Sequence, residues 1–318
     1  MTQYALPAVY ALFVWWFGTG LALYIVGRAR ETHRWSMLGA VAVFAASLYA
    51  LQHAAADAGS LGVYAAFTLA ILVWGAIEVS FLTGLVTGPI RSACPRDRGP
   101  WLRAAYAIGA ILWHELLLIA TGAAIVAITW GLPNQIGGWT FALLWTMRLS
   151  TKLNLFLGVP ILNDQFLPEP VAHLKSYFLK GPVSLFFPVS VTLATVLTIL
   201  LAEGSLIPGV IPAEGLMLLA TLSALAVLEH WFMVVPLPLE ALWRWSLKSE
   251  KPAVLANAAS VVTIVRTAQG AGTRAAFEAW AAPVISIRDA GDGDRAGKLG
   301  NRKNVLPHPA LSRQRRRP

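Results

Sequence analysis

Seven long apolar runs constrain the fold of this chain more than any other feature of the sequence. They are residues 5–27, 35–56, 61–87, 104–130, 137–158, 182–202 and 214–236. A helix that crosses a bilayer needs about 20 consecutive, mostly apolar residues, and each run reaches that length. Charged residues make up only 13% of the 318 positions, about half the share found in soluble globular proteins. The sequence therefore predicts an all-α, polytopic membrane bundle of seven transmembrane helices.

The positive charges between the runs predict how the bundle is oriented. Lys and Arg concentrate in the connections on the cytoplasmic side of a membrane. The N-terminus and the connections near 57–60, 131–136 and 203–213 contain neither residue type. The alternate connections at 28–34, 88–103 and 148–181 contain several of them. This alternation predicts an N-terminus outside and a C-terminus in the cytoplasm.

Two further segments stand apart from the predicted spans. Within residues 160–181, Val171, Leu174 and Phe178 recur at helical spacing, which predicts a cytoplasmic amphipathic segment that lies on the membrane or docks a partner helix. It belongs to a transmembrane domain over residues 1–247. Residues 248–318 are small, polar and basic, and we expect a largely disordered cytoplasmic tail attracted to anionic lipid. Because most of the net charge of +9 comes from this tail, nucleic acid is not an expected partner.

Several ionisable or strongly polar residues interrupt the apolar runs. They are Glu78, Glu115, Arg148, Lys152, Asn154 and Glu229. One charged side chain at the centre of a membrane helix costs about 2.5–3.5 kcal/mol, so we expect these groups to pair inside the bundle. At a rise of about 1.5 Å per residue, Glu115, Arg148 and Glu229 fall at similar depth. We therefore predict one intramembrane polar cluster, in which Glu115 and Glu229 neutralise Arg148 or Lys152.

Two of these carboxylates have a histidine as their direct neighbour, in "WHE" (Trp113–Glu115) and "EHW" (Glu229–Trp231). Adjacent helical positions are about 100° apart, so the imidazoles of His114 and His230 should face a surface different from that of the carboxylates. Three interpretations are open: a hydrogen bond between helices, a contact with a tetrapyrrole metal or another metal, or a proton relay. The Glu-x-x-His spacing of di-iron bundles is absent, and we predict no metal site. The tryptophans mostly fall near predicted span ends, which favours an interfacial aromatic belt.

Four long motifs resemble a known family. They are "EVSFLTGLVTGP" from Glu78, "WHELLLIA" from Trp113, "TKLNLFLGVPILNDQFLPEPVAHLKSYF" from Thr151, and "LEHWFMVVPLPLEALW" from Leu228. Over about residues 5–245 the chain resembles the photosynthetic complex assembly protein 2 family (PuhE) of purple phototrophic bacteria. The counterparts of the family's polar positions are Glu78, His114, Glu115, Lys152, Asn154, Asn163, Glu229 and His230.

The resemblance implies a multi-pass protein of the bacterial cytoplasmic membrane, either the inner or the intracytoplasmic membrane. Such a protein would serve assembly of the photosynthetic reaction centre and its core light-harvesting complex, or adjust bacteriochlorophyll supply. No catalytic residue is implied, so the first hypothesis is a non-enzymatic assembly factor. Its partners would be reaction-centre or core antenna subunits and membrane lipids, with His114 and His230 as contacts to bacteriochlorophyll or to a partner.

Two other hypotheses stay open. A membrane transporter or proton-conducting protein would use the cluster of Glu, His, Arg and Lys, since ionisable residues inside a membrane commonly mark transport paths. A membrane enzyme with a His/Glu metal site is the weaker of the two, because the metal-binding spacings are missing.

Overall fold

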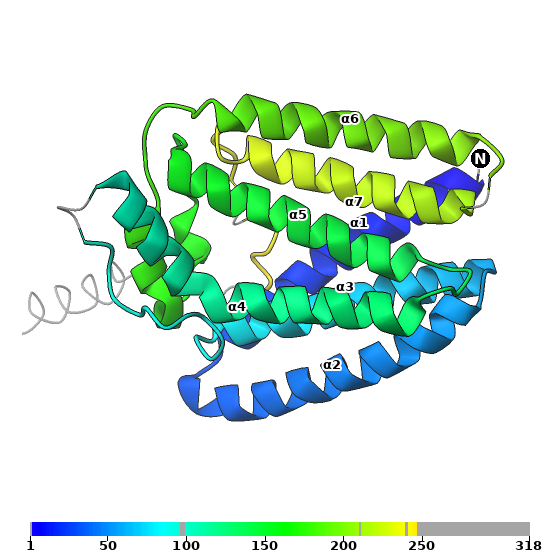
Figure 1. The fold of residues 1–318 in the computed structure, drawn as a ribbon, viewed down its shortest axis with the longest axis horizontal. Helices are drawn as coiled ribbons and strands as arrows, with labels where there is room; N and C mark the ends of the chain where they lie inside the picture. The colour runs from blue at the N-terminus through cyan, green and yellow to red at the C-terminus, as the bar shows by residue number, and fades with distance from the viewer. Residues whose placement is uncertain (1, 96–98, 210, 239–240, 247–318) are drawn as a thin grey trace, which may run out of the picture. The chain divides into compact units, whose positions relative to one another are not determined.

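The computed structural model describes residues 2–95, 99–209, 211–238 and 241–246. Seven α-helices form within these ranges, as Figure 1 shows. They are α1 (Thr2–Val26), α2 (His33–Ala56), α3 (Ser60–Leu82), α4 (Pro100–Thr129), α5 (Ile136–Leu157), α6 (Phe186–Leu206) and α7 (Ala213–Trp231). The prediction of an all-α fold is confirmed. The predicted disordered tail, residues 248–318, lies outside the described residues.

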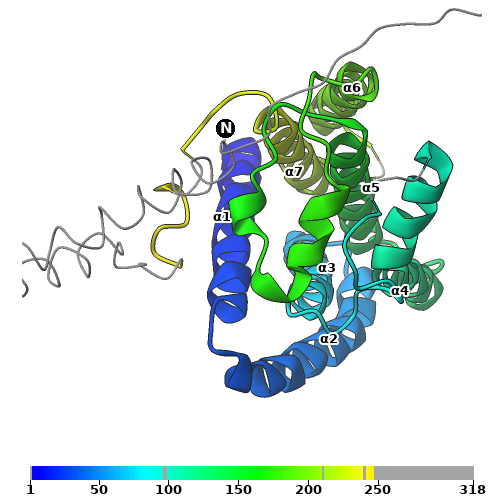
Figure 2. The ribbon, with the colours of Figure 1, turned by 90° about the vertical axis from the view of Figure 1, so that its left-hand side faces the viewer.

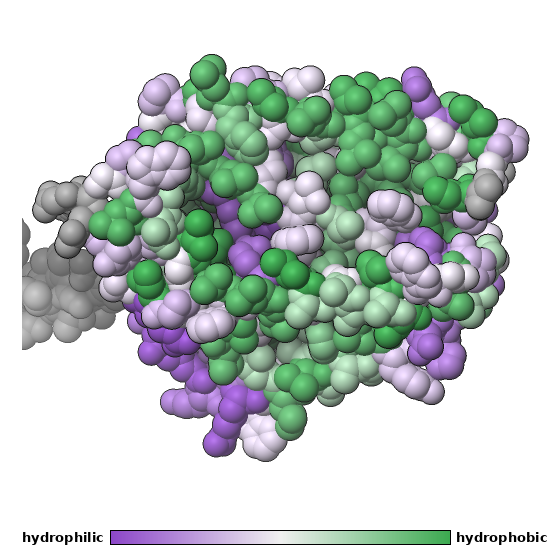
Figure 3. Space-filling view, viewed as in Figure 1, coloured by the Kyte–Doolittle hydropathy of each residue, from purple (hydrophilic) through white to green (hydrophobic). Residues whose placement is uncertain are grey.

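Six of the seven described helices are long and apolar enough to cross a membrane: α1, α2, α3, α4, α6 and α7. The exception is α5, which carries Arg148, Lys152 and Asn154. Its 22 residues would still span about 33 Å, and it lies alongside the others in Figure 1. The face shown in Figure 3 is mostly hydrophobic along the helices, and hydrophilic residues gather toward the two ends. The chain is thus a multi-pass membrane protein, while the seventh span and the outside N-terminus stay predictions.

Helix α3 occupies the centre of the bundle and contacts α1, α2, α4, α5 and α7. Its side chains Val63, Phe67, Ala70 and Val73 are fully buried. Half of the residues in its most apolar stretch are buried inside the protein, which explains why the run is apolar on the faces that meet other helices. The one acidic residue of α3, Glu78, is buried among these helices.

Two of the predicted spans extend beyond the C-terminal ends of the helices that form there. The run 61–87 becomes a helix that ends at Leu82, since Gly84 adopts φ +78°, a conformation that only glycine takes without strain. The run 214–236 becomes a helix that ends at Trp231, and the carbonyl of Phe232 accepts a hydrogen bond from the Asn163 side chain at 2.9 Å. Both extensions are apolar, so composition alone cannot locate these helix ends.

The segment 160–181 forms two 3₁₀-helical stretches, η2 (Asp164–Phe166) and η3 (Glu169–Tyr177), and η3 is kinked at Val171. In Figure 2 this segment lies across the end of the bundle. Its apolar side is buried inside the protein against Phe81 and Ala110. The buried residues are Val171, Leu174 and Tyr177, spaced by three. The α-helical prediction of Phe178 as the third member was wrong, because a 3₁₀-helix repeats every 3.0 residues.

Candidate functional site

Glu78 of α3 is the centre of an ionic cluster inside the bundle. Its side chain is buried, and one carboxylate oxygen, Oε2, lies 3.3 Å from Nη2 of Arg148 on α5. The other oxygen, Oε1, lies 3.7 Å from Nε2 of His114 on α4. The His114 imidazole packs on the Phe81 ring, with 4.3 Å between the two ring centroids. Phe81 lies one turn beyond Glu78 on α3. One carboxylate thus joins three helices.

A second ion pair lies one turn further along α5. The Lys152 ammonium donates to Oε1 of Glu115 at 2.6 Å, while the Trp145 indole donates to Oε2 of the same carboxylate at 3.2 Å. The ammonium also lies 5.5 Å from the centre of the Phe81 ring, close enough for a cation–π attraction. Lys152 and Glu115 are each about one-fifth exposed. Pairing of Glu115 with Lys152 is one of the two arrangements that the sequence predicted.

Glu229 does not take the predicted role of neutralising Arg148 through a direct bond. Its Oε1 accepts a hydrogen bond from the Trp15 indole of α1 at 2.8 Å, and the carboxylate that bonds Arg148 belongs to Glu78. The depth estimate put Glu229 and Arg148 at the same level but could not give the rotation of α7. Trp15 was assigned to an interfacial belt, whereas it packs inside an aromatic group with Trp243 at 5.6 Å.

His230 is a hydrogen-bonding residue between helices. One ring nitrogen, Nε2, lies 2.8 Å from the Ser150 hydroxyl of α5, and Nδ1 lies 2.8 Å from the Ala226 carbonyl of its own helix. The network continues through Asn154, whose amide donates to the Ser150 carbonyl and to the Ser190 hydroxyl of α6, both at 3.0 Å. It links α5, α6 and α7. Sequence reasoning did not single out either serine, although the spacing of four between Ser150 and Asn154 places them on one face.

The loop after α3 holds α4 in place beside the cluster. The backbone N–H of His114 donates to the Thr87 carbonyl at 2.9 Å, and the N–H of Ile90 donates to the Gly109 carbonyl at 3.3 Å. Figure 1 shows that α4 bends along its length. Groups that insert into a helical hydrogen-bond ladder commonly cause such bends. Close passage of the loop requires Gly88, because a Cβ there would clash with the Gly109 carbonyl oxygen.

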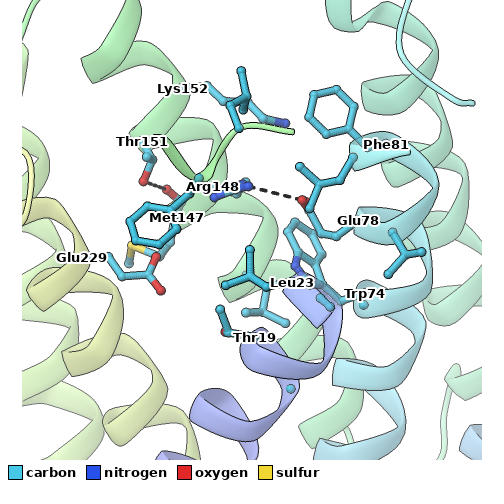
Figure 4. A pocket seen from close by; sticks show the side chains of 18 of the residues that line it. Thr19, Leu23, Trp74, Glu78, Phe81, Met147, Arg148, Thr151, Lys152 and Glu229 are labelled. Atoms are coloured by element: carbon cyan, nitrogen blue, oxygen red, sulfur yellow. Dashed lines mark hydrogen bonds and ion pairs between the residues drawn. The ribbon is translucent and has the colours of Figure 1, made fainter. Parts of the chain in front are cut away.

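A cavity of about 820 Å³ opens beside the ion pairs, lined mainly by α1, α2, α3, α5, α7 and the 162–178 segment. Figure 4 shows Glu78 and Glu229 on opposite sides of it, with Arg148 between them. The polar residues on its wall include Glu78, Arg148, Lys152 and Glu229. Most other lining residues are apolar, among them Trp74 and Met147. The cluster therefore combines charged groups with space for a large apolar molecule.

The contact of His114 and His230 with a pigment or a partner stays a prediction. Neither is among the residues that line the cavity. His230 uses both ring nitrogens in hydrogen bonds. The His114 side chain is fully buried against Phe81 and Glu78, and neither ring nitrogen has a hydrogen-bond partner within the described residues. Among the described residues, no group of three or more His, Cys, Asp or Glu side chains could hold a metal ion.

Comparisons with known proteins identify the family. No solved structure matches the chain. An uncharacterised 30.4 kDa protein of Rhodobacter capsulatus, named for its position in the puhA 5′ region, is 42% identical over 259 residues. The matched part covers 78% of this chain and 93% of that protein. A family model described as a protein of unknown function, DUF3623, matches residues 1–254. The chain therefore belongs to the DUF3623 family, a family of unknown function.

Proposed function

We propose that this protein is a non-enzymatic assembly factor of the PuhE type for the photosynthetic reaction centre and its core light-harvesting complex. It would work in the inner or intracytoplasmic membrane of a phototrophic bacterium. The observation that carries the proposal is the relative in the puhA 5′ region, which is similar along nearly its whole length. A gene position beside puhA associates that relative with photosynthesis. The motifs from Glu78, Trp113, Thr151 and Leu228 support the same assignment through their resemblance to PuhE.

The architecture suits a partner made of membrane helices. Charged groups of α3, α4 and α5 are bonded to one another inside the bundle. Apolar side chains such as Leu38, Leu193 and Leu200 are more than half exposed on the outer surface of α2 and α6. Such surfaces can contact lipid or the transmembrane helices of another subunit. Adjustment of bacteriochlorophyll supply remains a narrower form of the proposal.

A transporter is the less favoured hypothesis. A proton or solute path would need carboxylates that can exchange partners along the membrane normal. Glu115 is held by both Lys152 and Trp145, and Glu229 is held by Trp15. These fixed bonds favour a structural role for both groups.

Co-purification tests the assembly proposal. The full-length chain would be tagged in the phototrophic bacterium that carries it and purified in a mild detergent after phototrophic growth. We expect reaction-centre or core antenna subunits to co-elute, identified by mass spectrometry and by near-infrared absorption. An equally tagged, unrelated membrane protein from the same cells serves as the control. If neither subunits nor pigment are enriched over that control, and deletion of the gene leaves core-complex absorption unchanged, the proposal is wrong.

A further inference from the structure

The cavity beside Glu78 has the size and wall of a site for a large apolar ligand. Its volume of about 820 Å³ lies in the upper part of the range of ligand pockets, about 300–1,000 Å³. Small residues keep it open, since Gly39 of α2 and Gly75 of α3 line it and a Cβ at either would meet no atom within 4 Å. The wall is mainly aliphatic and aromatic. Such a space suits a long hydrocarbon chain.

One polar group on this wall has unused hydrogen-bonding capacity. A guanidinium carries five N–H donors, yet Arg148 makes only one hydrogen bond within the described part of the chain, to Glu78. Its side chain is 39% exposed and points into the cavity between Glu78 and Glu229 in Figure 4. Polar donors in apolar surroundings are costly without an acceptor. A ligand that offers oxygen acceptors would satisfy them.

The charges around Arg148 restrict the head group of such a ligand. Three carboxylates, Glu78, Glu115 and Glu229, lie near the Arg148 guanidinium, against two cations, Arg148 and Lys152. Glu115 is bonded to Lys152 and is not part of the cavity wall. An anionic head would add to the surplus of negative charge, while a cationic head would lie against the Arg148 guanidinium. An uncharged head with carbonyl oxygens meets neither repulsion.

The bilayer itself can supply this ligand. The cavity is lined by both α1 and α2, which make few contacts with each other compared with α2 and α3. At the end of the bundle it is bounded by residues of the 162–178 segment. Entry from the side, between α1 and α2, keeps the hydrocarbon chain in apolar surroundings throughout.

We propose that this cavity binds an uncharged amphiphile from the membrane, with its carbonyl oxygens on Arg148 and its long apolar chain between α1, α2 and α3. The inference does not depend on the assembly role, and either can fail alone.

Fluorescence quenching can test the site, because Trp15, Trp74 and Trp243 line the cavity and bromine quenches nearby indoles. The purified full-length chain in detergent would be titrated with 9,10-dibromostearoyl glycerol, which has an uncharged ester head. The matched probe is 9,10-dibromostearate at alkaline pH, which has the same tail and a carboxylate head. We expect saturable quenching by the glycerol ester and at least about tenfold weaker binding of the carboxylate.

Two glycine variants separate the cavity from the detergent micelle. Gly75→Leu fills the cavity and should weaken binding of the ester at least about tenfold. Gly138→Leu, on α5 and not among the lining residues, should bind as the wild type does. Arg148→Lys keeps the positive charge but replaces five N–H donors in a planar fork with three on a shorter side chain, and should bind the ester more weakly while it elutes as a folded protein. Equal or tighter binding of the carboxylate, or quenching that is unsaturable or unchanged in Gly75→Leu, would overturn the proposal.

Discussion

Arg148 of α5 donates a hydrogen bond across 3.3 Å to Glu78 of α3, although the two residues are 70 positions apart in the chain. Together with the pair between Lys152 and Glu115, it explains how α5 can carry two cations and still lie inside an apolar bundle. A buried charge that loses its partner destabilises a protein far more than the pair stabilises it. The pair also forms one wall of the large cavity, so it connects the stability of the bundle with the proposed ligand site.

The hydrogen bond between Ser150 and His230 predicts a specific loss of stability. Ser150→Ala removes the partner of a buried imidazole nitrogen, and an unsatisfied buried polar group costs about 1–3 kcal/mol. We expect a lower free energy of unfolding by that amount in mixed SDS and mild-detergent micelles. Thr146→Ala on the same helix is the control, because Thr146 is exposed and bonds only the Ala142 carbonyl. Equal effects of the two substitutions would contradict the proposed link between α5 and α7.

The passage of the 85–90 loop over α4 predicts that Gly88 tolerates no side chain. Gly88→Ala would push its Cβ into the Gly109 carbonyl, and overpacking costs about 1–3 kcal/mol. Because His114 is bonded to Thr87 in the same loop, the substitution should also disturb the ion pairs. Gly138→Ala is the matched control, since its Cβ would meet only Ile125 at 3.9 Å. We expect the control to leave the free energy of unfolding unchanged or to raise it. If Gly88→Ala also leaves that free energy unchanged, the proposed close packing of the loop on α4 is wrong.

Cysteine labelling tests the predicted orientation. Cys94 is the single cysteine of the chain and is partly exposed, in a connection predicted to be cytoplasmic. A membrane-impermeant maleimide should label it in inside-out vesicles and leave it unlabelled in sealed right-side-out vesicles. Ser60→Cys in a Cys94→Ser background should show the opposite pattern, since Ser60 is exposed at the other end of α3. Labelling of both positions from one side would refute the topology.

Much of this fold could be predicted from the sequence because apolar runs and helix length are local properties. All seven predicted runs correspond to α-helices. The ends of the runs near Leu82 and Trp231 were misplaced, since Gly84 and the contact between Asn163 and Phe232 act through conformation and tertiary structure. The 3₁₀ geometry of Glu169–Tyr177 was likewise not visible in a pattern that fits the α-helical period nearly as well.

The candidate site was predictable in its members but not in its pairings. The depth in the membrane that was estimated from the sequence placed four charged residues close to one another, and they do form ion pairs. These residues are Glu78, Glu115, Arg148 and Lys152. Helix rotation decides which carboxylate faces which cation, and no local pattern encodes it. For that reason Arg148 was assigned to the wrong carboxylates. The cavity was not predicted either, because it forms where several helices leave space between them, which no local sequence pattern encodes.

A double-mutant cycle on Glu78 and Arg148 tests the central claim most directly, with the free energy of unfolding in mixed micelles as its readout. We predict that Arg148→Leu lowers this free energy by about 3 kcal/mol, the lower end of the range for breaking a buried pair. Adding Glu78→Gln should restore part of that loss, whereas adding Glu229→Gln should restore none. Strictly additive effects of Arg148→Leu and Glu78→Gln, or equal rescue by Glu229→Gln, would contradict the account.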